Sequence, residues 1–134
     1  MKRKIPLRVP VTRGLKDLYA MDMHLAYQAA CLDSFNVTAF SRLAAAISVV
    51  RSALDQHAEG KDLAIEALDA AITILLEVRH RGDQTGVWEI TLSERPVVLK
   101  GIKMAEECIG FLDVALLERT AAKLLQDVCG EAAA

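Results

Sequence analysis

The chain is poor in aromatic residues and proline, and it has no long apolar run. Aromatic side chains make up 4% of the 134 residues, and there are three prolines. The core must therefore be built from Leu, Ile, Val, Ala and Met, which is typical of packed helices. The uncharged and mostly apolar run over residues 43–50 is far shorter than the roughly 20 apolar residues of a transmembrane helix. We expect no membrane span.

Cysteine is also scarce, and its spacing is informative. Cys31, Cys108 and Cys129 form an odd, widely spaced set that matches neither a zinc site nor a disulfide framework. We expect reduced thiols, with Cys31 and Cys108 buried as small apolar residues. The basic N-terminus is not followed by an apolar signal segment, so we expect a cytoplasmic protein. No catalytic or cofactor motif is present, and the sequence predicts neither an enzyme nor a bound cofactor or metal.

Helical periodicity is the main positive feature. Hydrophobic residues make up 53% of the chain, and they recur every three or four residues in four stretches, 15–32, 39–58, 61–81 and 94–128. In the first stretch, the expected buried row is Leu18, Met21, Leu25, Ala29 and Leu32. The predicted fold is all-α, a four-helix antiparallel bundle formed by one domain, residues 15–134.

The last stretch carries two apolar rows, one position apart around the helix. The first row is Val98, Ile102, Ala105, Ile109, Leu112 and Leu116, and the second is Val97, Gly101, Met104, Cys108, Phe111 and Ala115. Two such rows predict a long C-terminal helix that is covered on most of its circumference. We expect a homodimer or other homo-oligomer through Val97, Val98, Ile102, Met104, Cys108, Ile109, Phe111 and Leu112.

The N-terminal segment, residues 1–14, is expected to be an extended basic arm because Pro6 and Pro10 disfavour a helix. Six basic residues precede Asp17, which leaves ten basic against 18 acidic residues in the remainder. Three interpretations remain open. The arm contacts nucleic-acid phosphates through Lys2, Arg3, Lys4, Arg8 and Arg13, docks on an acidic ridge of a second copy (Asp62, Glu66, Asp69 and Glu77), or is a solvated tail.

Two polar clusters are candidate binding sites. Arg79, His80 and Arg81, with Trp88 nearby, could bind a small anion or nucleic acid. In the alternative interpretation, Trp88 closes the end of the core and the arginines cap helix carbonyls. Glu77 and His80 have the spacing of one metal-binding pair, to which Glu106 or Glu107 could add a carboxylate. Di-iron bundles need a second such pair, and the sequence has none.

The sequence therefore favours a non-enzymatic helical interaction or scaffold protein that self-associates and binds a protein partner of unknown identity. Its general style resembles small helical accessory proteins of bacterial phages and plasmids, without matching a family. The alternatives are a nucleic-acid-binding protein that uses the basic arm, and a helical bundle that binds a metal or small ligand.

Overall fold

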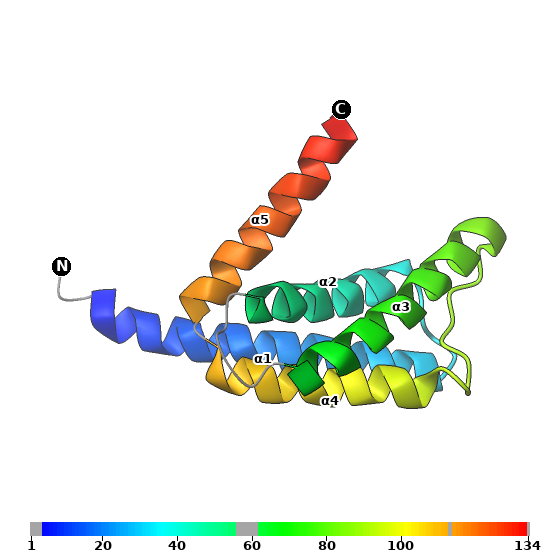
Figure 1. The fold of residues 1–134 in the computed structure, drawn as a ribbon, viewed down its shortest axis with the longest axis horizontal. Helices are drawn as coiled ribbons and strands as arrows, with labels where there is room; N and C mark the ends of the chain where they lie inside the picture. Colours follow the sequence, from blue (N-terminus) through cyan, green and yellow to red (C-terminus); the bar gives the residue numbers. More distant parts are fainter. Residues whose placement is uncertain (1–3, 56–61, 113, 134) are drawn as a thin grey trace.

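The computed structural model describes residues 4–55, 62–112 and 114–133, with side chains over 16–55, 62–112 and 115–126. These residues form five helices and no strand, so the all-α prediction is confirmed. The helices are α1 (Lys4–Cys31), α2 (Val37–Leu54), α3 (Asp62–Thr85), α4 (Arg95–Phe111) and α5 (Val114–Ala133). Helices α1 to α4 pack together, with successive helices reversing direction, and α5 projects away from them (Figure 1).

The N-terminal segment is helical where an extended arm was expected. Helix α1 begins at Lys4 and includes both Pro6 and Pro10. Pro6 falls in the first turn, where a backbone N–H has no helical acceptor and proline is tolerated. Pro10 removes one internal hydrogen bond, but its fixed φ is compatible with a helix. The expectation of an extended arm is therefore wrong for residues 4–14.

Helix α1 also turns a different face to the core than expected. Met23, Ala26 and Ala30 are buried, whereas Leu18 and Leu25 of the expected buried row are exposed. Two of the three buried positions are alanines, and small side chains let helix backbones approach closely. The close contact of α1 with α2 and α4 thus uses Met23 and two alanines, and it leaves Leu18 and Leu25 outside.

Helix α2 is the central helix of the chain, and it contacts each of the other four helices. Its first turn is capped by Asn36, whose side-chain oxygen accepts a hydrogen bond from the Ala39 N–H at 2.9 Å. Leu43, Ile47, Val50 and Leu54 are completely buried. Among the described helices, α2 alone is long and apolar enough to pass as a membrane span, and buried core helices pass the same test.

Helices α3 and α4 form the most extensive helix pair, and a glycine sets their separation. Gly101 of α4 is buried against α3. A Cβ atom at this position would lie 2.5 Å from the Cβ of Ala71 and 3.5 Å from the Ala67 carbonyl oxygen. Only glycine therefore allows the observed approach of the two helices.

The long C-terminal helix expected over 94–128 is divided in two. Helix α4 ends at Phe111, and Leu112 adopts an extended conformation with φ −74° and ψ 145°. The Leu112 side chain is buried in the core, so the change of direction keeps this apolar residue out of water. Helix α5 then contacts α2 and α1 near its start and projects away from them over the rest of its length (Figure 1). The expected four-helix bundle with one long final helix is replaced by four packed helices and a projecting fifth.

Two glycines of α4 give a matched pair of stability tests. Gly101→Ala should destabilise the protein by about 1–2 kcal/mol, because overpacking outweighs the gain of about 1 kcal/mol in helix propensity. Gly110→Ala meets nothing within 4 Å and should stabilise the protein by up to about 1 kcal/mol. Chemical denaturation followed by circular dichroism measures both changes. Equal stabilities of the two variants would contradict the close packing inferred at Gly101.

Candidate interaction surface

Most of the residues expected at a subunit interface belong instead to the core of the chain. Five of the eight are buried: Val98, Ile102, Cys108, Ile109 and Leu112. Val97 is partly buried, Met104 packs against the core, and Phe111 is 53% exposed. The part of the two apolar rows that lies in α4 is thus mostly covered by the other helices, with Phe111 as the exposed exception. Cys31, expected to be buried, is exposed.

The basic cluster at the end of α3 is largely occupied by contacts within the chain. Arg81 donates two hydrogen bonds to the carboxylate of Glu94, at 2.9 and 2.7 Å, and a third to the Glu89 carbonyl oxygen at 3.2 Å. The Glu94 carboxylate also accepts the Thr91 backbone N–H at 3.0 Å. This forked pair fastens the loop between α3 and α4 to the end of α3. We call it the Arg81–Glu94 clamp.

The other members of the cluster point to the same structural role. Trp88 packs against Gly82, where no side chain larger than hydrogen would fit, and its ring lies 5.1 Å from that of Phe40. Arg79 lies 3.7 Å from Asp83, and His80 is exposed. The geometry thus agrees with the interpretation that Trp88 closes the end of the core. Lys2 and Arg3 lie outside the described residues, as do the side chains of Lys4, Arg8 and Arg13.

The possible metal ligands do not converge in the described part of the chain. No three His, Cys, Asp or Glu side chains there are close enough together to hold a metal ion. Glu106 bonds to His24 of α1 rather than completing a set with Glu77 and His80, with 2.8 Å between His24 Nε2 and Glu106 Oε1. This exposed pair links α1 to α4.

The clamp shifts the ionisation of both its members. The hydrogen bonds from Arg81 hold the pKa of Glu94 below its ordinary value near 4.5, although burial of the carboxyl opposes this shift. The same contact raises the pKa of Arg81. The carboxylate form of Glu94 therefore stabilises the fold at neutral pH.

A row of large apolar residues on α1 faces solvent. Leu18, Met21, Leu25 and Leu32 are 51%, 56%, 54% and 75% exposed. Their spacing of three, four and seven residues places them along one side of the helix, roughly opposite Met23 and the other core residues. We call this row the α1 seam. The remaining exposed large apolar residues of the described chain are scattered over other elements, as is normal for a protein surface.

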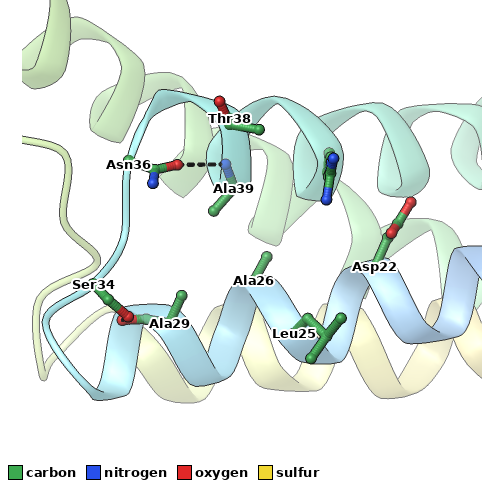
Figure 2. Close-up of a pocket in the computed structure, with 9 residues that line it drawn as sticks. Asp22, Leu25, Ala26, Ala29, Ser34, Asn36, Thr38 and Ala39 are labelled. Atoms are coloured by element: carbon green, nitrogen blue, oxygen red, sulfur yellow. Dashed lines mark hydrogen bonds between the residues drawn. The ribbon is translucent and has the colours of Figure 1, made fainter.

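A pocket of about 350 Å³ adjoins the seam between α1 and the start of α2 (Figure 2). Leu25 belongs both to the seam and to the pocket wall, and Asp22, Ala26 and Ala29 of α1 complete that side. The opposite wall includes Thr38, Ala39 and Arg42 of α2. A helix lying along the seam would therefore also border this pocket.

Three acidic residues lie beside the seam or just beyond the end of α1. Asp17 and Asp22 flank the row, and Asp33 follows the helix. Burial, followed by the charges of Glu118 and Asp22, raises the pKa of the nearby Tyr19 hydroxyl. By contrast, every charged residue of the chain before Asp17 is basic. All Lys and Arg residues of α1 thus lie at or before position 16, and its two acidic residues, Asp17 and Asp22, lie beside the seam.

Comparison of the chain with protein-family profiles, with curated proteins and with solved structures gives no match.

The clamp gives a pH-dependent prediction. Glu94→Ala should lower the free energy of unfolding by about 2 kcal/mol at pH 7, because the change leaves Arg81 without its carboxylate. Since the folded state lowers the pKa of Glu94, its contribution is present above about pH 4.5 and is lost as the pH falls through the pKa of the folded state. Denaturation curves at several pH values should show that the difference in the free energy of unfolding between the wild type and Glu94→Ala decreases as the pH is lowered.

Glu89→Ala is the matched control, because the Glu89 side chain is exposed and Arg81 bonds to its backbone carbonyl. This variant should change the stability by less than about 0.5 kcal/mol. The clamp would be refuted if the two substitutions cost the same, or if the loss in Glu94→Ala did not depend on pH.

Proposed function

We propose that the protein is a non-enzymatic helical interaction protein that self-associates through the α1 seam. The observation that carries this proposal is the exposure of Leu18, Met21, Leu25 and Leu32 along one side of a helix. Spacings of three and four residues are those of the contact positions in a coiled coil, where apolar side chains from two helices interlock. A contiguous exposed apolar row of this kind is characteristic of a protein–protein contact.

The size of the seam sets the expected strength of association. Burying the exposed half of one such side chain contributes about 1 kcal/mol, so eight of them in a symmetric pair contribute about 8 kcal/mol. This gain is comparable to the general cost of bringing two proteins together, about 4–15 kcal/mol. The four seam residues alone therefore leave at most about 4 kcal/mol, which corresponds to a millimolar dissociation constant. We expect the flanking residues to supply the remainder of a dimer in the micromolar range.

Self-association can be measured by sedimentation velocity from about 1 to 200 µM, a range that brackets a dimer of this strength. The double variant Leu18→Glu/Leu25→Glu should be monomeric throughout, because four charges would face each other in the pair. Both positions are more than half exposed, so the variant should keep its helical circular dichroism.

The matched control is Leu63→Glu/Leu92→Glu, which introduces the same charges at two exposed leucines away from the seam. It should associate as the wild type does. A wild-type chain that stays monomeric over the whole concentration range would refute the proposal, and so would an equal loss of association in both double variants.

Nucleic-acid binding is the second candidate, and one observation favours it. The basic first half of α1 extends past the ends of α2 and α4 (Figure 1). A projecting helix of this charge could contact phosphates. Replacing Arg8 and Arg13 by Glu should then abolish a salt-sensitive shift in the mobility of duplex DNA or RNA. If the unaltered protein shifts neither one at low salt, this candidate is excluded.

A further inference from the structure

The charged residues beside the α1 seam favour one relative direction of the two α1 helices in a pair of copies. This inference rests on the proposed self-association. In coiled-coil terms Leu18, Leu25 and Leu32 occupy the first contact position of each heptad, and Met21 and Gln28 the second. The flanking positions on one side hold Asp17, His24 and Cys31, and those on the other hold Asp22 and Ala29. In two-stranded coiled coils, the flanking residues determine the direction of the partner helix.

A parallel pair would bring like charges together. In that arrangement, a residue on one flank of the first helix faces the residue five positions further along the sequence, on the other flank of the second helix. Asp17 would therefore face Asp22 of the second copy, and the symmetry of the pair would repeat this contact. The basic first halves of both helices would also lie side by side. Each of these juxtapositions is repulsive.

An antiparallel pair removes both conflicts. In an antiparallel pair, each flank of one helix meets the same flank of the other helix. If Leu18 packs beside Met21 of the second copy, Asp17 lies next to His24 of that copy. The basic first half of each α1 then lies along the second half of the other, which carries no Lys or Arg, so the two basic segments are kept apart. The side chain of His24 is 46% exposed, and it bonds only to Glu106 among the described residues.

We infer that two copies of this chain pair antiparallel through α1, with Leu18 of each beside Met21 of the other. The two-fold axis then passes between residues 18 and 21. Leu25 and Asp22 line the pocket between α1 and α2. In the pair, each copy therefore also covers the edge of this pocket in the other copy.

The direction of pairing can be measured with a spin label on the native Cys31. This thiol is exposed, whereas Cys108 is buried, so only Cys129→Ser is needed as background. At a rise of 1.5 Å per residue, the two labelled positions lie about 35 Å apart in the antiparallel pair and roughly 10–15 Å apart in a parallel one. Dipolar spectroscopy distinguishes these distances. A distance near 35 Å supports the inference, and a short distance in a dimeric sample overturns it.

A charge reversal gives an independent readout with opposite signs for the two directions. Asp17→Lys should weaken an antiparallel pair roughly three- to tenfold, because it replaces the acid that faces His24. The same change should strengthen a parallel pair, because lysine would face Asp22. Glu66→Lys, the same change on the exposed surface of α3, should leave the dissociation constant unaltered.

The outcomes separate the two proposals. A dimer that is tightened by Asp17→Lys or has closely spaced labels overturns the antiparallel inference and leaves self-association standing. A chain that is monomeric by sedimentation overturns both.

Discussion

The structure depends on the close approach of helices through small side chains. Ala26 and Ala30 bring α1 against its neighbours, and Gly101 brings α4 against Ala71 of α3. Because the chain has few aromatic residues, it fills the space between helices with aliphatic side chains at short separations. The packing is therefore sensitive to single added atoms at these positions.

This constraint also decides which face of α1 remains uncovered. Both sides of the helix carry apolar residues, and close packing with α2 and α4 takes the side that holds Ala26 and Ala30 together with Met23. Leu18, Met21, Leu25 and Leu32 are then left outside. Among the described residues, the exposed large apolar side chains that form a row consequently lie along α1, where the sequence interpretation had placed such a row on the last helix.

The sequence predicted the helices better than their faces and ends. All-helical structure and the approximate positions of α2 and α3 follow from periodicity and residue type. The face of α1 could not be chosen from periodicity, since both of its sides are apolar and the larger side chains were assigned to the core. The heptad spacing of Leu18, Leu25 and Leu32 is a sequence feature that fits their exposure along one side of the helix.

Two boundaries were missed for different physical reasons. Prolines at positions 6 and 10 were interpreted as excluding a helix, but their fixed φ is helical and only the interior one costs a hydrogen bond. The division between α4 and α5 has a fainter signal, Gly110 followed by Asp113, which are residue types common near helix ends and starts. Apolar rows that continue across this point obscured it.

The polar contacts distinguish surfaces whose charged groups are bonded within the chain from surfaces whose charged groups remain accessible to a partner. At one end of the molecule, Arg81 and Glu94 satisfy each other, and Arg95 donates to the Ala30 carbonyl oxygen at 3.1 Å, so the end of α1 is tied to the loop before α4. These charges serve the fold and have little capacity left for a ligand. Along α1, by contrast, Asp17 and Asp22 make no hydrogen bond or ion pair within the described chain, and they lie beside exposed leucines. Unused charge next to unused apolar surface is the combination that a specific contact between proteins requires, because burial supplies the affinity and charge sets the direction.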